Sequence, residues 1–401
     1  MGDPATPLRL TTLQIFWRFL RFGMLAWGGP VAQIAMVRRA LVDEEHWVTG
    51  GRFNRLLAVY QVLPGPEAHE LCVHLGMVAG GRRGGLAAGL GFMLPGFILM
   101  FALSWLYFRF DLTQSALAPL FIGVQIGVIA LIVRAVHRIG GHVLTDGWLW
   151  ATGIISAIAA YAGVSFWIVL PAAGLAYLSL RQRNLWLAVG VAIVAAVLVF
   201  LTLRAPVGGQ APLVTVAPLI PAGTVSPLLL FLSGLKAGLL TFGGAYTVIP
   251  FVRGDAVGSG WMTDGQFLDG VALSGILPAP LIIFSTFVGY CAGGPVGALV
   301  MTAGIFLPAF AFSLLFYDRL ERVVENERLH SFLEGVAAGV IGFIVATTLQ
   351  LATALVGRVP SLPWGLAIFV GGLALLYLWR SKLNLAVVIV LSGVAGYFTL
   401  R

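Results

Sequence analysis

Charged residues are scarce in this chain of 401 residues. Asp, Glu, Lys and Arg together make up 10% of it, and 59% of the residues are hydrophobic, whereas soluble domains carry about 25% charged residues. This composition excludes an ordinary soluble domain. Because apolar stretches long enough to span a bilayer recur along the sequence, we predict an all-α, polytopic integral membrane protein.

Cysteine is also rare. Cys72 and Cys291 lie inside apolar segments at positions that do not match each other, which favours packing residues over a disulfide. His69 and His74 are five residues apart and do not share a helix face, so we predict no metal site. Because no nucleophile is accompanied by an evident base, we expect neither a cofactor nor an enzymatic activity.

The formal net charge of +8 would suit a nucleic-acid partner. The basic residues, however, are nearly all arginines in short loops between apolar segments, as membrane insertion produces when cytoplasmic loops collect Lys and Arg. We therefore expect the lipid bilayer, and no nucleic acid, around this chain.

The sequence contains an internal repeat. Residues 25–30 (Leu-Ala-Trp-Gly-Gly-Pro) and 63–66 (Leu-Pro-Gly-Pro) return in the second half as 240–244 (Leu-Thr-Phe-Gly-Gly) and 277–280 (Leu-Pro-Ala-Pro). Other positions match at an almost constant offset: Trp47 with Trp261, Phe53 with Phe267, and Gly80-Gly81 with Gly293-Gly294. A duplicated unit is the simplest explanation, and it determines the architecture.

Residues 204–226 are rich in Pro and Gly and poor in charge, which is typical of a connecting segment. We place an N-terminal repeat at 1–203, a linker at 204–226 and a C-terminal repeat at 227–401. The first repeat has an odd number of membrane crossings, so the second enters the bilayer from the opposite side. Two inverted-topology repeats with broken or re-entrant helices are the architecture of secondary transporters.

The Gly-Gly and Pro-x-Pro motifs interrupt long apolar segments near their middles, and each such segment is predicted to be two half-helices. Irregular backbone inside a bilayer is tolerated only where protein or water surrounds it, so the breaks should line a cavity. Segments 13–37 and 53–79 either cross the membrane or fold back as re-entrant hairpins. The distribution of Lys and Arg favours hairpins, with a cytoplasmic N-terminus.

The second half-helices begin at the breaks, where their free N–H groups and partial positive charge favour an anion. Arg21 and Lys236 precede the two glycine pairs by the same interval, and a charge within a membrane segment marks either a site or a snorkelling side chain. The predicted substrate-binding residues are Arg21, Gly28, Gly29, Pro30, Pro64, Gly65, Pro66, Lys236, Gly243, Gly244, Pro278, Ala279 and Pro280.

Ionisable residues follow the first Pro-x-Pro motif but not the second. Glu67, Glu70 and His74 are spaced by three and four residues and share a helix face. With His69 they are predicted coupling or gating groups. Two structural interpretations stay open: Glu67 as a first-turn acid that complements the helix dipole, and Glu70 with His74 as a packing pair.

At these motifs the chain resembles the chromate transporter family in its two-domain, long-chain form. The resemblance is carried by 27–32 (Trp-Gly-Gly-Pro-Val-Ala), by 63–68 (Leu-Pro-Gly-Pro-Glu-Ala) and by the second glycine pair, and it extends over nearly all of 13–400. It implies export of chromate, with sulfate as the similar oxyanion, across the bacterial inner membrane. Cations and helix N-termini suit a tetrahedral dianion.

The sequence therefore predicts a secondary transporter that exports chromate by alternating access, with a site near the membrane midplane between the repeats. A homodimer is a further expectation. The alternatives are a transporter or exchanger of sulfate or another oxyanion, and a cation/proton antiporter that uses Glu67, Glu70 and His74.

Overall fold

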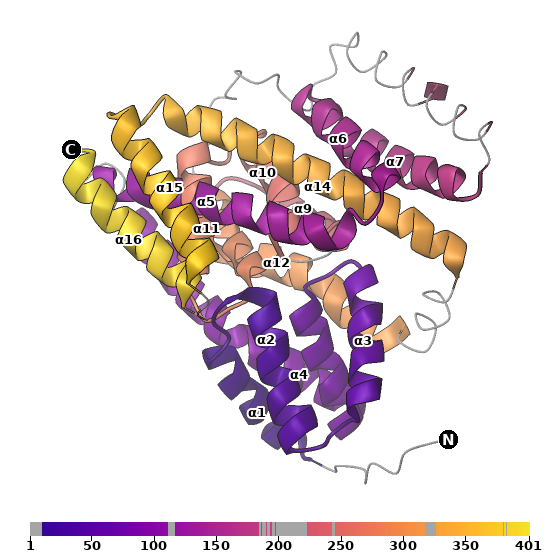
Figure 1. The fold of residues 1–401 in the computed structure, drawn as a ribbon. Coiled ribbons are helices and arrows are strands. Elements are labelled where there is room, and N and C mark those ends of the chain that lie inside the picture. Colours follow the sequence, from indigo (N-terminus) through magenta and orange to yellow (C-terminus); the bar gives the residue numbers. More distant parts are fainter. Residues whose placement is uncertain are drawn as a thin grey trace.

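The computed structural model describes residues 10–110, 117–183, 223–242, 245–316, 326–379 and 383–401, with a few isolated positions between them. All named elements in these ranges are helices, which confirms the predicted all-α class (Figure 1). The predicted linker lies largely outside the described residues, as does most of the apolar segment before it.

The first segment folds back on itself. Helix α1 (Thr12–Met24) ends before the Gly28-Gly29 break, and α2 (Gly29–Arg38) continues as the π-helix η1 (Arg39–Glu44). Arg18, in the middle of α1, forms an ion pair with Glu45, just after η1. If α2 had continued in the direction of α1, these residues would lie more than about 25 Å apart. The chain therefore reverses at the glycine pair, as the hairpin prediction requires.

A second reversal follows at the Pro-x-Pro motif. Helix α3 (Gly50–Val62) ends there and α4 (Glu67–Arg109) begins. The ring of Tyr60 lies 6.1 Å from that of His74, and Arg52, near the start of α3, interacts electrostatically with the same histidine. The Tyr60–His74 ring contact and the packing of α3 on α4 show that the two elements lie side by side.

Helix α4 is itself two helices joined by a tight turn. Gly81 has φ +63°, a left-handed conformation that suits glycine. A Cβ atom on Gly76 would lie 2.6 Å from the carbonyl oxygen of Gly84, so the backbones before and after the turn are in contact. The part before the turn is short, and only the part after it is long enough to span a membrane.

The second half repeats these reversals. Helix α9 (Pro227–Leu239) is followed by the 3-10 helix η2 (Ala245–Val248) and α10 (Ile249–Ala256), and Lys236 of α9 pairs with Asp255 of α10. Helix α11 (Asp264–Gly275) leads through the 3-10 helix η3 (Leu281–Ile283) into α12 (Phe284–Ala311) and the π-helix η4 (Phe312–Phe316).

The turn inside α12 matches the turn inside α4. Gly294 has φ +62°, ψ −154°, and Gly81 has φ +63°, ψ −160°. The glycines around the turn are in close contact here too, because a Cβ on Gly289 would lie 2.4 Å from the carbonyl oxygen of Gly297. Residues that match in sequence therefore adopt the same backbone conformation.

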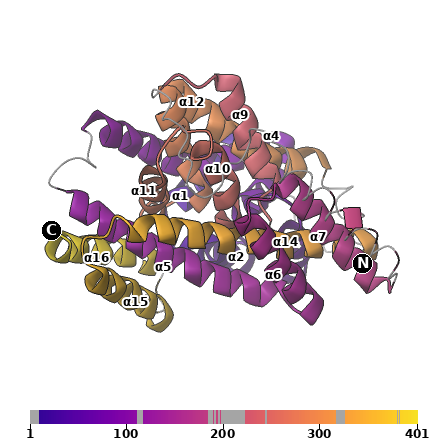
Figure 2. The same ribbon diagram turned by 90° about the horizontal axis from the view of Figure 1, so that it is seen from above.

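Long helices flank these broken segments: α5 (Ala118–Val143), α6 (Gly147–Tyr161), α7 (Phe166–Arg181), α14 (Glu327–Val356), α15 (Leu362–Leu378) and α16 (Asn384–Thr399). Figures 1 and 2 show α14 beside α5, with α15 and α16 near one end and α6 and α7 near the other. Glycines allow close approach: a Cβ on Gly123 of α5 would lie 2.2 Å from the Ser392 carbonyl oxygen of α16. Such small-residue contacts are typical of membrane helices.

The two halves meet along a central seam. Gly85 and Gly89 of α4 lie against Leu314 of η4 and Phe310 of α12, so the long parts of α4 and α12 run antiparallel. Pro64 forms an isolated antiparallel bridge with Phe242, and the Gly65 N–H donates to the Thr241 carbonyl oxygen at 2.8 Å. A break of the first half is thus hydrogen-bonded to a break of the second.

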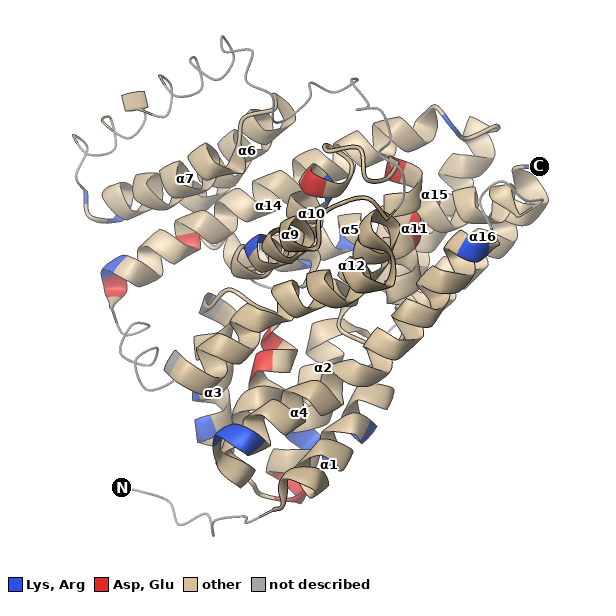
Figure 3. Ribbon diagram, turned by 180° about the vertical axis from the view of Figure 1, so that it is seen from behind, with Lys and Arg blue, Asp and Glu red and all other residues tan. Residues whose placement is uncertain are grey.

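The surface is that of a membrane protein. In the part of the chain that the structure describes, four helices are long and apolar enough to cross a bilayer. Large apolar side chains point outward along several helices, including Trp148 of α6, Trp167 of α7, Leu366 of α15 and Phe398 of α16. Figure 3 shows that most of the ribbon carries no charge. The predicted polytopic membrane class is confirmed.

Candidate anion site

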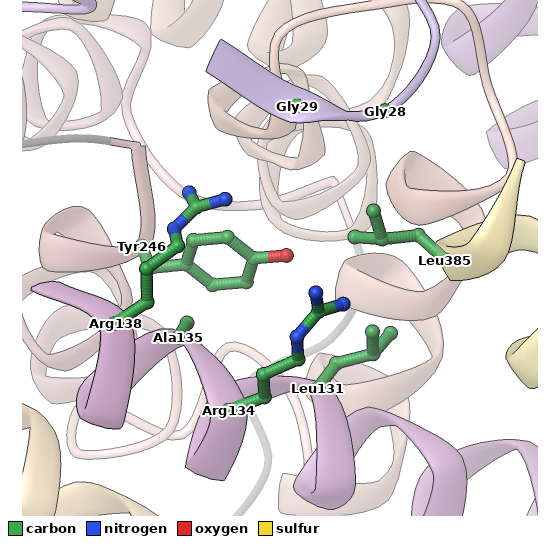
Figure 4. A pocket seen from close by; sticks show the side chains of 8 residues that line it. All are labelled: Gly28, Gly29, Leu131, Arg134, Ala135, Arg138, Tyr246 and Leu385. Carbon is green, nitrogen blue, oxygen red and sulfur yellow. The ribbon is translucent and has the colours of Figure 1, made fainter. Parts of the chain in front are cut away.

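A pocket opens where the first glycine break faces α5. Its walls come from four parts of the chain that the sequence separates widely: the break after α1, helix α5, η2 and the start of α16 (Figure 4). The lining residues are Gly28, Gly29, Leu131, Arg134, Ala135, Arg138, Tyr246 and Leu385.

Two arginines give the pocket its charge. Arg134 and Arg138 are four residues apart on α5, so their side chains leave the same helix face. In Figure 4 both guanidinium groups extend toward the break, with the Tyr246 hydroxyl between them. Arg134 is half-buried, and its guanidinium lies 5.9 Å from the Tyr377 ring, a cation–π contact that holds the charge near the pocket.

The opposite wall is backbone. Gly28 (φ +90°) and Gly29 (φ +78°) both have left-handed conformations, and Gly28 is the N-cap of α2. A Cβ on Gly29 would meet no atom within 4 Å, so open space begins at the backbone itself. The N-terminal N–H groups of α2 therefore face the pocket with their partial positive charge.

This arrangement suits a small oxyanion. Guanidinium groups donate paired hydrogen bonds to oxyanions, and they stay charged at every physiological pH. A phenolic hydroxyl and helix N-terminal N–H groups supply further donors. These donors converge on one space, and no acid is among the lining residues; Glu67, which interacts electrostatically with Arg138, lies outside the lining.

The predicted acidic cluster lies beside the pocket and is buried. Glu67 is 8% exposed, and His69 and Glu70 are fully buried. His69 donates from Nε2 to the Gly89 carbonyl oxygen at 3.2 Å, and its ring packs 4.9 Å and 4.8 Å from Phe306 and Phe310. These contacts explain His69 as a packing residue between the two halves.

The other predicted residues lie apart from the pocket. Arg21 is exposed on α1, and Lys236 is occupied by its ion pair with Asp255 and lies 5.3 Å from the Phe166 ring. Of the predicted substrate-binding set, the pocket includes Gly28 and Gly29. Gly243 and Gly244 lie outside the described residues.

The remaining predicted residues form or flank the helix breaks. Pro30 is in the first turn of α2, and Pro66 and Pro280 are the N-caps of α4 and η3. Pro64 and Gly65 belong to the seam. The break at Pro278 and Ala279 packs against α4, where a Cβ on Gly96 would meet the Ala279 Cβ.

Sequence reasoning missed Arg134, Arg138 and Tyr246. The sequence pattern groups these arginines with the basic loop residues that set membrane orientation, whereas the structure places them in α5, which extends to Val143. Their spacing of four within a continuous helical pattern was the available signal. Tyr246 had no such signal, because it follows a break in the other half and reaches α5 only through the fold.

Comparison with known proteins decides the family. The sequence profile of the family described as "Chromate transporter" matches twice, at residues 13–179 and 228–397. The chain belongs to the chromate transporter family. The resemblance predicted from the glycine and proline motifs is confirmed, and this member is a transporter, not an enzyme.

Several relatives of this chromate transporter family member span nearly its whole length, and others cover one part of it. It is 64% identical to a chromate transport protein of Pseudomonas aeruginosa over 98% of this chain and 94% of the relative. It is 30% identical to one of Cupriavidus metallidurans over 90% and 87%. An uncharacterized transporter of Bacillus subtilis, YwrB, is 30% identical over 36% of this chain and 73% of its own length. No solved structure matches significantly.

Proposed function

We propose that this protein exports chromate across the bacterial inner membrane by alternating access, with the anion bound between Arg134, Arg138, Tyr246 and the Gly28-Gly29 break. Transport of chromate across a membrane follows from the family. Direction, mechanism and site are the proposal, and one observation carries the site: two arginines of one helix face a glycine break that opens directly onto empty space.

Alternating access is supported by the arrangement of the halves. The long parts of α4 and α12 match in sequence and run antiparallel along the seam, as inverted repeats would. The family profile matches each half separately. Inverted repeats with discontinuous helices rock about a central site in secondary transporters. The pocket combines elements of both halves, since α2 and α5 precede the linker and η2 and α16 follow it.

Export is the direction that the membrane potential favours. Moving a dianion out of a negative interior gains about 4.6 kcal/mol per 100 mV, twice the value for a single charge. The distribution of basic residues supports a cytoplasmic N-terminus. Sulfate, also a tetrahedral dianion, should compete for the same donors, so a sulfate or other oxyanion exchanger is the second candidate.

The decisive experiment measures chromate uptake into inside-out vesicles. Arg134→Ala and Arg138→Ala should each reduce uptake about ten- to a hundredfold, because each loses charge-assisted hydrogen bonds of about 1.5–3 kcal/mol. The matched control is Arg328→Ala, which removes an exposed arginine from α14 outside the pocket. Uptake at the wild-type rate in both pocket variants would refute the site, and sulfate competition would rank the two candidate substrates.

The cation/proton antiporter alternative has a separate test. It needs Glu67, Glu70 and His74 as its site, so Glu67→Gln and Glu70→Gln would abolish all transport. Under the proposal, chromate exchange persists in these variants and is lost with the arginines. Transport that required the carboxyls but neither arginine would favour the antiporter.

A further inference from the structure

Glu70 is a buried carboxyl group that the structure leaves without partners. Its side chain is 0% exposed, and in the described part of the chain neither Oε1 nor Oε2 has a hydrogen-bond partner. A bare carboxylate in such surroundings is very unfavourable, because it has lost water and gained nothing. The group is stable there when it carries a proton.

A second buried carboxyl provides the contrast. Asp269 of α11 is also 0% exposed, but its Oδ2 accepts a hydrogen bond from the Tyr107 hydroxyl at 2.6 Å and its Oδ1 accepts one from Gln125 Nε2 at 2.8 Å. Two donors stabilise a negative charge. Burial alone therefore does not distinguish Glu70; the lack of donors does.

Glu70 also lies at the seam. A Cβ on Gly65 would be 2.5 Å from Glu70 Oε1, so the carboxyl rests on the Pro-Gly-Pro break. The N–H of Gly65 is hydrogen-bonded to Thr241 of the other half, and Ser313 of η4 donates to the Glu70 carbonyl oxygen at 3.3 Å. The Glu70 carboxyl therefore lies at the contact between the two halves.

Glu67 links this carboxyl to the pocket. It is one turn before Glu70 on the same face, and it interacts electrostatically with Glu70 and with Arg138. An anion in the pocket would compete with Glu67 for Arg138. Negative charge would then be less compensated around Glu70, which favours a proton there. The coupling is reciprocal, so a proton on Glu70 would also strengthen anion binding.

We propose that Glu70 is a proton-binding site coupled to the anion pocket: at an alkaline pH where the buried carboxyl of the anion-free protein has lost its proton, chromate binding draws one from water onto a Glu70 carboxylate oxygen, and chromate release returns it. This inference rests on the proposed chromate site and deepens it. On the same helix, the buried His69 and His74 lie within four residues of Glu70. From α3, Tyr60 packs against the His74 ring and Arg52 interacts electrostatically with His74.

The test titrates chromate into purified protein in detergent, in weak buffer with a pH indicator, at a series of alkaline pH values where free chromate is the dianion. As the pH rises and Glu70 of the anion-free protein loses its proton, the wild type should take up an increasing amount, reaching about one proton per bound anion. Glu70→Gln should bind chromate without uptake, and Glu70→Asp should restore it. Asp269→Asn, the matched loss of a buried carboxyl, should keep the uptake.

Each other result has a definite meaning. Chromate binding by the wild type without proton uptake would overturn the coupling and leave the anion pocket standing. Wild-type uptake in Glu70→Gln, or equal loss in Asp269→Asn, would overturn the assignment to Glu70. No chromate binding by the wild type would refute the proposed function itself. If Glu70→Gln does not fold, infrared difference spectra of the wild type decide: chromate must increase the protonated carboxyl C=O band, and no increase overturns the proposal.

Discussion

The two halves of the molecule have similar backbone conformations but different ionisable side chains. The turns at Gly81 and Gly294 have nearly the same φ and ψ, and α1 packs on α4 as α9 packs on α12. Yet the residues after the two Pro-x-Pro breaks differ: the first half has Glu67 and Glu70 where the second has apolar side chains. The backbone was kept in both halves, and the ionisable groups in one.

The flanking helices show the same asymmetry. Gly123 and Gly127 of α5 align with Gly335 and Gly339 of α14 at a constant offset. At that offset Arg134 corresponds to Ala346, and Arg138 to Gln350. Gln350 accepts a hydrogen bond from Arg253 at 2.7 Å and belongs to a local polar network. In the pocket, the second half thus contributes Tyr246 and Leu385, while the first half contributes both arginines.

Making the first half resemble the second should have the largest effect. The double variant Arg134→Ala with Arg138→Gln copies the second-half residues into α5 and should reduce chromate transport to background, since both guanidinium groups are lost. Vesicle uptake measures it. The reciprocal variant, Ala346→Arg with Gln350→Arg in that background, should not restore transport; a rescue would mean that the halves are interchangeable.

Removal of the ion-pair partner of Lys236 should have the next largest effect, a loss of folding stability. Its ion pair with Asp255 is only 22–23% exposed, so Asp255→Asn leaves a poorly hydrated charge and should cost about 1–3 kcal/mol of stability. Thermal unfolding in detergent would show it. Lys236→Met combined with Asp255→Asn should cost less than the single change, and a larger loss would contradict the pairing.

An exposed ion pair serves as the control for that comparison. The side chains of Arg39 and Glu44 are 81% and 56% exposed. Glu44→Gln should therefore change the free energy of unfolding by less than about 1 kcal/mol. An equal effect at both pairs would mean that burial around Lys236 has been overestimated.

Alanine substitutions at the two matched turns should lower the free energy of unfolding by equal, moderate amounts. Gly81 and Gly294 both have positive φ, and a Cβ at either would meet no atom within 4 Å. Gly81→Ala and Gly294→Ala should each cost about 1–2 kcal/mol, from backbone strain alone. Thermal unfolding of both variants would sharpen the comparison of the halves, since clearly unequal costs would show that the two turns are not equivalent.

The smallest effect on chromate uptake is expected for substitution of Arg21. Its position matches that of Lys236 in the sequence, but its side chain is exposed on α1 and lies outside the pocket lining. Arg21→Ala should leave chromate uptake close to the wild-type rate. A strong loss of uptake would restore Arg21 as a substrate-binding residue.

The breaks could be predicted from sequence because they depend on local backbone chemistry. Gly28, Pro66 and Pro280 end or begin helices wherever they occur in an apolar run, and the structure places helix starts at each of them. The distribution of loop arginines favours re-entrant hairpins, which stays a prediction; the structure shows that the chain reverses direction between Arg18 and Glu45. These features need no knowledge of which segments become neighbours.

The charged contacts could not be predicted in the same way. Lys236 meets Asp255 only because the chain turns back between them. Arg134 meets Gly28 only because α5 packs across the first break. A match between repeats indicated that Arg21 and Lys236 occupy equivalent places, but it did not give the direction of either side chain. Tertiary packing decides these roles.

The bridge between Pro64 and Phe242 has a mechanical consequence. It joins the halves by main-chain hydrogen bonding at their centre, away from the ends of the long helices. Under the proposed alternating access, this bridge would act as a pivot between the halves. Tilting about it would separate the halves on one face of the membrane and bring them together on the other.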